Sequence, residues 1–358
     1  RHRSGGQSGA SPPCQLPRPS GWGFFRGGKM TDFRVIIGDC IEGMRSLPDQ
    51  SVHTCVTSPP YFGLRDYGMA GQIGLEDTPD AFVARLVDVF REVRRVLRDD
   101  GTLWLNLGDS YASGGGVGQP HRDSSGGIGN KGTRGEQGYH ASGGGFVRPD
   151  TARNGLKPKD LIGIPWRVAF ALQADGWYLR QDIIWHKPNP MPESVTDRCT
   201  KAHEYVFLLS KGPKYFFDAE AIKEPSAYPG DNRASRRDLR KEIDPFCADN
   251  GSRARTGNPT GETRNRRSVW TVATKPYAGA HFATFPPDLI EPCILAGSPV
   301  GGTVLEPFGG SGTTAGVAMR NGRNAILCEL NPEYAALMPE RIAALGGNQC
   351  DLFRSAAQ

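Results

Sequence analysis

The sequence predicts an α/β protein whose core is a mostly parallel β-sheet flanked by helices. Strand-like and helix-like segments alternate, the clearest helix lies between two buried-type strands, and a glycine-rich turn joins another strand to a helix. With 358 residues, 37% of them apolar, the chain can bury a large core. The 47 glycines and 28 prolines exceed average usage, so we expect long irregular stretches as well.

The first predicted strand is followed by an acidic residue. Phe33 to Ile37 is an apolar run of strand type, and a helical stretch from Ile41 to Leu47 follows and ends at Pro48. Asp39 stands between them, at the carboxyl end of the strand, where open α/β sheets bind ligands. The same position suits the N-cap of the helix, and both interpretations stay open.

The clearest helix carries its own start signals. Thr78 is suited to the N-cap, Pro79 to the first helical position and Asp80 to the first turn. Apolar residues then recur at helical spacing, at Phe82, Leu86, Val89, Phe90, Val93 and Leu97. We expect Asp99-Asp100-Gly101 to end the helix and a buried strand to run from Thr102 to Leu107.

The middle of the chain combines regular elements with two irregular stretches. A helix is predicted from Pro165 to Ala174, and strands from Trp177 to Trp185 and from Tyr205 to Leu209. Residues 110–149 are dominated by Gly, Ser, Arg and His without periodicity, which is typical of a functional or disordered loop. Residues 225–275 are basic and interrupted by Pro and Gly.

A glycine-rich turn lies near the carboxyl end of the chain. The elements predicted around it are a helix from Asp288 to Leu295, a strand from Thr303 to Glu306, a helix from Ala315 to Arg320 and a strand from Asn324 to Cys328. Gly310, Gly312 and Ala315 match the GxGxxA spacing of a dinucleotide-binding turn, in which glycines let the backbone approach a cofactor closely. Glu329, at the end of the last strand, can hold ribose hydroxyls.

The stretch Thr57-Ser58-Pro59-Pro60-Tyr61 follows a strand predicted from Val52 to Val56. Its two prolines fix φ twice and remove two N–H donors, so the carbonyls of Ser58 and Pro59 are held outward with few local donors. These acceptors and the Ser58 hydroxyl suit a ligand amino group, and Tyr61 offers a flat face on which a ring can stack. A plain surface turn is the alternative.

Positive charge is concentrated in one segment. The formal net charge is +5, and residues 233–267 contain ten basic and five acidic side chains. An acidic partner would therefore be met there, and a nucleic-acid-contacting surface is favoured over a solvated linker. The candidate DNA-binding residues are Arg233, Arg236, Arg237, Arg264, Arg266 and Arg267.

Eight cysteines are scattered without a CxxC pair or a Cys/His cluster at zinc spacing. We therefore expect free thiols in a reducing, cytoplasmic compartment and no metal site. No apolar run approaches about 18 residues, so no membrane span is expected. Residues 1–29 lack periodicity and the apolar core of a signal peptide, and we expect a disordered or mistranslated leader before a start at Met30.

Five of these segments, in this order, resemble those of the permuted, beta-class amino-methylating DNA methyltransferases, in which the catalytic motif precedes the S-adenosylmethionine motif. Thr57 to Tyr61 resembles the catalytic Ser/Asp-Pro-Pro-Tyr motif, and Leu305 to Thr314 the cofactor loop. His281 to Leu289 resembles the segment before that loop, Glu329 to Tyr334 the ribose-binding turn, and Gly38-Asp39-Cys40 the turn near the adenine. The likeness runs from about residue 35 to 341, outside the two irregular stretches.

The resemblance implies a Rossmann-like S-adenosylmethionine-dependent methyltransferase fold with helices on both faces of the sheet. The implied catalytic residues are Ser58, Pro59, Pro60 and Tyr61. The implied cofactor-binding residues are Asp39, Phe285, Glu306, Pro307, Phe308, Gly310, Ser311, Gly312, Thr313 and Glu329, where Glu306 replaces the Asp that is common in the family. The implied segments are a leader (1–29), a catalytic half (30–224) with the insert 110–149, a target-recognition region (225–275), a cofactor-binding half (276–345) and a tail (346–358).

The implied function is in-line methyl transfer from S-adenosylmethionine to an exocyclic amine of a base extruded from duplex DNA. In this family Ser at the position of Ser58 mostly accompanies cytosine-N4 methylation and Asp mostly adenine-N6, so site-specific cytosine-N4 methylation is expected. The alternatives are an adenine-N6 enzyme, a nicotinamide-dependent oxidoreductase built on the GxGxxA turn, and an inactive DNA-binding protein with the same fold. A cognate restriction endonuclease is a second candidate partner; the recognition sequence and oligomeric state stay open.

Overall fold

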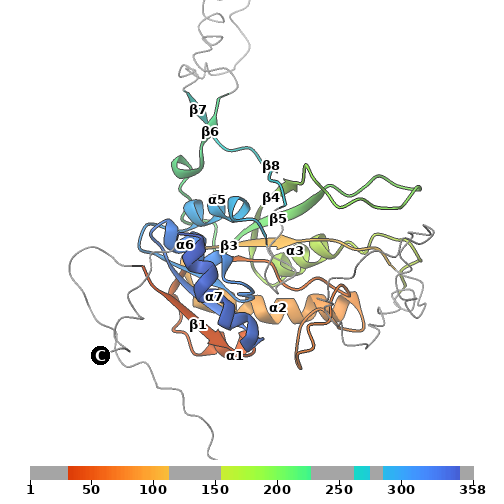
Figure 1. Cartoon of the computed structure of the whole chain (residues 1–358), viewed down its shortest axis with the longest axis horizontal. Helices are drawn as coiled ribbons and strands as arrows, with labels where there is room; N and C mark the ends of the chain where they lie inside the picture. The colour runs from red at the N-terminus through yellow and green to blue at the C-terminus, as the bar shows by residue number, and fades with distance from the viewer. Residues whose placement is uncertain (1–30, 113–154, 227–261, 275–284, 347–358) are drawn as a thin grey trace, which may run out of the picture. The chain divides into compact units, whose positions relative to one another are not determined.

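One sheet lies between two groups of helices in the computed structural model, which describes residues 31–112, 155–226, 262–274 and 285–346 (Figure 1). The predicted leader, most of the insert 110–149, Arg233, Arg236, Arg237 and nearly all of the tail lie outside the described residues. No helix among the described residues is long and apolar enough to cross a membrane.

The sheet has eight strands in the order β1-β10-β9-β2-β3-β5-β4-β8. These are β1 (Phe33–Ile37), β2 (Val52–Thr57), β3 (Leu97–Leu107), β4 (Tyr178–His186), β5 (His203–Ser210), β8 (Val269–Thr271), β9 (Thr303–Glu306) and β10 (Asn324–Glu329). Parallel pairing joins β1, β10, β9, β2 and β3 in turn, whereas β5 runs antiparallel to both β3 and β4. The predicted mostly parallel sheet is confirmed.

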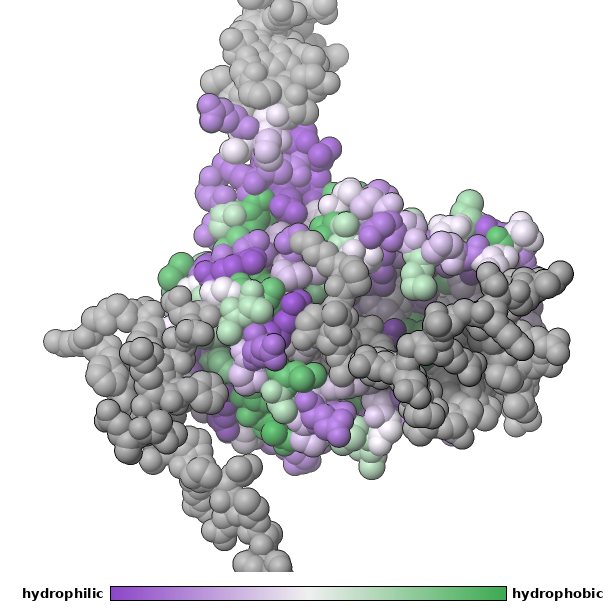
Figure 2. Space-filling model, in the orientation of Figure 1, coloured by the Kyte–Doolittle hydropathy of each residue, from purple (hydrophilic) through white to green (hydrophobic). Residues whose placement is uncertain are grey.

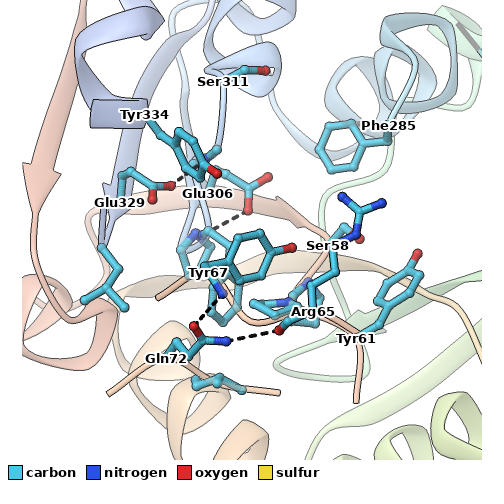
Figure 3. Close-up of a pocket in the computed structure, with 18 of the residues that line it drawn as sticks. Ser58, Tyr61, Arg65, Tyr67, Gln72, Phe285, Glu306, Ser311, Glu329 and Tyr334 are labelled. Carbon is cyan, nitrogen blue, oxygen red and sulfur yellow. Dashed lines mark hydrogen bonds between the residues drawn. The ribbon is translucent and has the colours of Figure 1, made fainter. Parts of the chain in front are cut away.

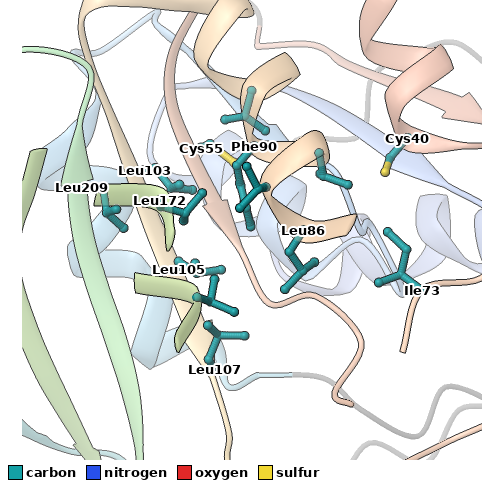
Figure 4. Close-up of a cluster of buried hydrophobic side chains, with 14 of the residues drawn as sticks. Cys40, Cys55, Ile73, Leu86, Phe90, Leu103, Leu105, Leu107, Leu172 and Leu209 are labelled. Atoms are coloured by element: carbon teal, nitrogen blue, oxygen red, sulfur yellow. The ribbon is translucent and has the colours of Figure 1, made fainter. Parts of the chain in front are cut away.

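Helices cover both faces of this sheet, as the resemblance implied. Helices α1 (Cys40–Arg45), α2 (Pro79–Val96) and α3 (Ile164–Ala174) pack in one buried cluster, and α5 (Pro287–Gly297), α6 (Thr313–Arg320) and α7 (Pro332–Ala344) pack in another. Successive residues of β3 alternate between the two: Leu103 and Leu105 join the first cluster, shown in Figure 4, and Trp104 joins the second. This alternation follows from the two-residue period of a strand.

The junction of α2 and β3 differs from the prediction. Thr78 caps α2 as expected, because its hydroxyl accepts a hydrogen bond of 3.0 Å from the Ala81 N–H. The expected stop at Asp99-Asp100-Gly101 is wrong: Leu97 is already extended and pairs with Val52 of β2, so β3 begins directly after the helix. Parallel pairing at this register overrides the turn signal of the two aspartates and the glycine.

Strand β8 and helix α7 were not predicted from the sequence. Strand β8 lies in the basic stretch, and it joins the sheet because Trp270 is buried and the Trp185 indole donates to the Val272 carbonyl at 2.8 Å. Helix α7 follows the candidate ribose turn, and Asn331 caps it by accepting from the Glu333 N–H at 2.8 Å. A strand as short as β8 shows too little periodicity to be recognised.

A small second sheet lies outside the main one. Strands β6 (Glu224–Pro225) and β7 (Thr263–Arg264) pair antiparallel, and a 3₁₀ turn, η2 (Glu220–Ile222), precedes them. The β6–β7 hairpin therefore brings together the chain on either side of residues 227–261.

Candidate active site

The carboxyl ends of β1, β2, β9 and β10 meet at one edge of the sheet and open into a cavity of about 450 Å³ (Figure 3). Open α/β sheets bind ligands at this edge, and the volume is within the range of small-molecule sites. All the predicted catalytic and cofactor-binding residues line the cavity except Gly312. Gly312 has φ of +81° at the start of α6, and a Cβ there would come within 3.2 Å of Met338, so its position serves helix packing.

The candidate catalytic motif joins a partly buried polar network. The Tyr61 hydroxyl donates to the Glu204 carboxylate at 2.6 Å, and the Asn106 amide donates to the same oxygen at 3.2 Å. The other Glu204 oxygen pairs with the Lys187 ammonium at 2.5 Å. Burial, followed by the charge of Glu204, raises the pKa of Tyr61 well above its ordinary value, so Tyr61 stays a hydrogen-bond donor.

The Tyr61 ring packs against the backbone at Gly108. A Cβ at Gly108 would lie 2.5 Å from Cε2 of Tyr61, so no other residue fits there without moving the ring. Gly108 is the residue after β3, beside the strand that carries Asn106. The ring is therefore held at its hydroxyl by Glu204 and at its edge by this close approach.

Glu306 is a buried carboxylate at the end of β9. It accepts hydrogen bonds from the Thr57 hydroxyl, from the Thr314 hydroxyl at 2.9 Å and from the Phe308 N–H at 3.2 Å. Burial raises the pKa of Glu306 to about 8, against the opposing effect of the three donors. A buried carboxyl beside an open cavity is suited to receive a cationic group, such as the ammonium of an amino acid moiety.

Glu329 fastens the glycine turn to the end of β10. One carboxylate oxygen accepts from the Gly310 N–H at 2.7 Å and the other from the Asn331 N–H at 2.9 Å. A carboxylate has about four lone-pair sites, so Glu329 can accept further hydrogen bonds, such as those of ligand hydroxyls. Burial raises the pKa of Glu329 as well. The neighbouring Gly309 has no room for a side chain, since a Cβ would lie 2.9 Å from the Met338 methyl.

Asp39 fulfils the capping role that the sequence left open. Its Oδ1 accepts from the N–H groups of Ile41 and Glu42 at 2.9 and 3.1 Å, and its Oδ2 pairs with Arg85 at 3.2 Å. Asp39 also lines the cavity, so contact with a ligand stays a prediction.

A loop after the catalytic motif forms another part of the cavity wall. Gln72 holds it closed, since its carbonyl accepts from the Tyr67 N–H at 2.7 Å and its amide donates to the Arg65 carbonyl at 3.1 Å (Figure 3). Arg65 and Tyr67 line the cavity, as does Tyr334 of α7. Tyr334 belongs to the predicted ribose-binding turn, whereas Arg65, Tyr67, Asn106, Lys187 and Glu204 were not predicted from the sequence as site residues. An acid directly before the apolar run of β5 was the one signal for Glu204.

The described arginines of the basic stretch lie on another part of the molecule. Arg264 and Arg267 both pair with Glu224, at 2.8 and 2.6 Å, and the Arg266 guanidinium lies 4.7 Å from the centre of the Trp270 ring. They line no part of the cavity. The surface around the β6–β7 hairpin is hydrophilic (Figure 2). Among the described residues, no group of three or more His, Cys, Asp or Glu could hold a metal ion.

Comparison with known families assigns the class of the protein. A family model described as DNA methylase, covering N6- and N4-acting enzymes, matches residues 52–340. The chain therefore belongs to this family, and it is a DNA methyltransferase that uses S-adenosylmethionine. The resemblance drawn from the five segments is confirmed, and a nicotinamide-dependent oxidoreductase is set aside.

Individual relatives agree with this assignment over most of their length. The chain is 49% identical over 309 residues to the type II methyltransferase M.SmaI of Serratia marcescens, covering 86% of this chain and 90% of M.SmaI. It is 48% identical over 320 residues to the type II methyltransferase M.Cfr9I of Citrobacter freundii, with 89% and 90% covered.

Solved structures share the fold. TTHA0409 of Thermus thermophilus, complexed with S-adenosyl-L-methionine, superimposes with a TM-score of 0.51 at 26% identity, covering 89% of this chain and 97% of that one. The cytosine-N4-specific PvuII DNA methyltransferase superimposes with a TM-score of 0.55 at 19% identity, with 88% and 92% covered. The latter likeness shows the fold alone.

The described cavity fits S-adenosylmethionine. The buried Glu306 carboxyl offers a partner for an ammonium, Glu329 offers acceptors for hydroxyls, and the turn at Gly309 and Gly310 leaves the backbone free of side chains. When bound, the cofactor supplies an electrophilic methyl group on a sulfonium. The chain itself must supply the acceptors that orient the amine of the base.

Proposed function

We propose that this protein methylates the exocyclic N4 amine of cytosine at a specific site in duplex DNA. The observation that carries the proposal is Ser58-Pro59-Pro60-Tyr61, which lines the same cavity as the Glu306 and Gly310 turn. Ser at the first position of this motif mostly accompanies cytosine-N4 methylation among the enzymes that the chain resembles. The type II designation of M.SmaI and M.Cfr9I supports a modification role, with a restriction endonuclease of the same specificity as partner.

The chemistry requires the amine of the base to become a better nucleophile. Its lone pair is delocalised into the ring, so the nitrogen must pyramidalise before it can attack the methyl group. The Ser58 hydroxyl and the Pro59 carbonyl would accept the two amine hydrogens and favour this geometry. The two prolines keep these acceptors free of local donors. Alignment of nitrogen and methyl group would supply much of the rate.

The base must first leave the duplex, at a cost of a few kcal/mol for unpairing and unstacking. In this proposal the Tyr61 ring receives the extruded base by stacking. Glu204 and Lys187 then act as positioning residues, because the hydrogen bond of 2.6 Å from Tyr61 to Glu204 fixes the tilt of the ring. Trp185 and Thr274 line this part of the cavity as well.

The test is incubation with methyl-labelled S-adenosylmethionine and mixed-sequence duplex DNA, followed by digestion to nucleosides and mass spectrometry against standards. N4-methylcytosine is the expected product. Detection of N6-methyladenine would show that the target base is adenine and not cytosine. Cofactor binding without any methylated nucleoside, under conditions where M.SmaI is active, would identify an inactive DNA-binding protein.

A further inference from the structure

Met191 is the most exposed large apolar side chain among the described residues, at 86% exposure, and it also lines the catalytic cavity. It lies in the connection between β4 and β5, which extends away from the sheet (Figure 1). Single exposed apolar side chains are common on protein surfaces, so what distinguishes Met191 is that its exposed side chain also lines this cavity.

The backbone around Met191 is stiff and tied down. Pro190 and Pro192 flank it, which fixes φ on both sides and favours an extended chain. Asn189 anchors the segment to Thr274, since the Asn189 amide donates to the Thr274 carbonyl at 3.1 Å and the Thr274 N–H donates to Asn189 at 3.0 Å. Thr274 follows β8 and lines the same cavity. The Met191 side chain therefore projects from a backbone segment that two prolines and two hydrogen bonds hold in place.

Extrusion of a base leaves a gap in the duplex directly above the cavity that receives the base. Proteins that distort duplexes commonly insert apolar side chains, Met among them, between base steps to offset lost stacking. The chain belongs to a family of DNA methylases, and Met191 lies on the cavity that is proposed to receive the base. Duplex DNA is thus the occupant that the position of Met191 favours.

We propose that Met191 enters the duplex and fills the space that the extruded base vacates. This inference rests on the base extrusion in the proposed function, but it does not depend on which base is methylated. It predicts that Met191 lowers the cost of extrusion while leaving cofactor binding and methyl transfer untouched.

The experiment compares Met191→Ala, Met191→Leu and the wild-type protein on two duplexes that carry the methylated site mapped for the wild type. In one duplex the target base is paired, and in the other it faces an abasic position, so that extrusion costs little. Burial of a Met side chain predicts about a tenfold loss of kcat/KM for Met191→Ala on the paired duplex. On the abasic duplex we expect a change of less than about twofold, and Met191→Leu should retain activity on both.

Val300→Ala is the matched control, because Val300 is 70% exposed and lies outside the cavity. It should behave as the wild type on both duplexes. Equal losses of kcat/KM for Met191→Ala on the two duplexes, or no loss on the paired duplex, would overturn the proposal that Met191 fills the space of the extruded base. Failure of the proposed function would give a different result. If the wild type produced N6-methyladenine, the target base would be adenine, and the same comparison of paired and abasic duplexes would still test the role of Met191.

Discussion

Replacement of Glu306 by glutamine should stabilise the protein in the absence of cofactor, and the gain should grow with pH. Glu306 is buried, and its pKa is raised from 4.5 to about 8. Because the folded state holds the proton more tightly than the unfolded state, the stability that Glu306 contributes is present below pH 4.5 and is lost as pH rises through 8. Glutamine does not titrate, so the Glu306→Gln variant does not lose this stability as pH rises.

The hydrogen bonds of the site allow this exchange without a new defect. A glutamine at 306 can accept from the Thr57 hydroxyl and the Phe308 N–H through its carbonyl, and its amide can donate to the Thr314 hydroxyl. The shift of the Glu306 pKa gives a stability advantage for Glu306→Gln of about 1 kcal/mol at pH 5.5 and about 4 to 5 kcal/mol at pH 8.5. The free energy of unfolding should therefore separate by about 3 kcal/mol across this range.

Urea denaturation of both proteins at several pH values between 5.5 and 8.5, without cofactor, measures this difference. The pKa of Glu329 is also raised, but its contribution is common to both proteins and largely cancels. Two curves of unfolding free energy that stay parallel across the range would refute a raised pKa at Glu306. A Glu306→Gln variant that loses stability relative to the wild type as pH rises would show that the pKa of Glu306 is lowered instead of raised.

Three further predictions concern the catalytic motif and the DNA surface. Ser58→Ala should keep S-adenosylmethionine binding, measured by calorimetry, while turnover falls sharply; equal loss of both would remove the role of Ser58 as an acceptor. Glu204→Ala removes the 2.6 Å partner of the Tyr61 hydroxyl, which keeps the longer contact of 3.4 Å with Asn106 Oδ1, and should lower kcat by about 10- to 100-fold; Glu204→Gln should retain most activity, with cofactor affinity constant in both. Replacement of Arg264, Arg266 and Arg267 together should weaken DNA binding and reduce its salt slope by about 0.9 for each phosphate contact. Glu224→Gln breaks the ion pairs of Arg264 and Arg267 but keeps the positive charge of all three arginines, so it should not weaken binding; an unchanged slope in the triple variant would return this segment to a structural role.

The parallel half of the fold could be predicted from sequence because its signals are local. The strand Thr303–Glu306 coincides with the prediction, and α2 begins at Pro79 as the Thr78 cap indicated. The glycine turn and the Pro-Pro pair lie directly after strands, so their residues reach the same edge of a parallel sheet without any knowledge of long-range contacts. The candidate catalytic and cofactor-binding residues could be predicted to lie together for this reason, and all but Gly312 line one cavity.

The other wall of the cavity could not be predicted, because non-local pairing creates it. Glu204 reaches the Tyr61 hydroxyl, 143 positions away in sequence, only because β5 inserts antiparallel between β3 and β4. Thr274 reaches the mouth because β8, a three-residue strand without usable periodicity, pairs with β4. Strand β5 is antiparallel to both of its neighbours, and β8 is added at the edge of the sheet by parallel pairing with β4. Glu204, which would position Tyr61, and Met191, which would replace the target base, are therefore supplied by the half of the sheet whose pairing the local pattern does not encode. The candidate residues for the base amine and for the cofactor, in contrast, follow directly from the local pattern.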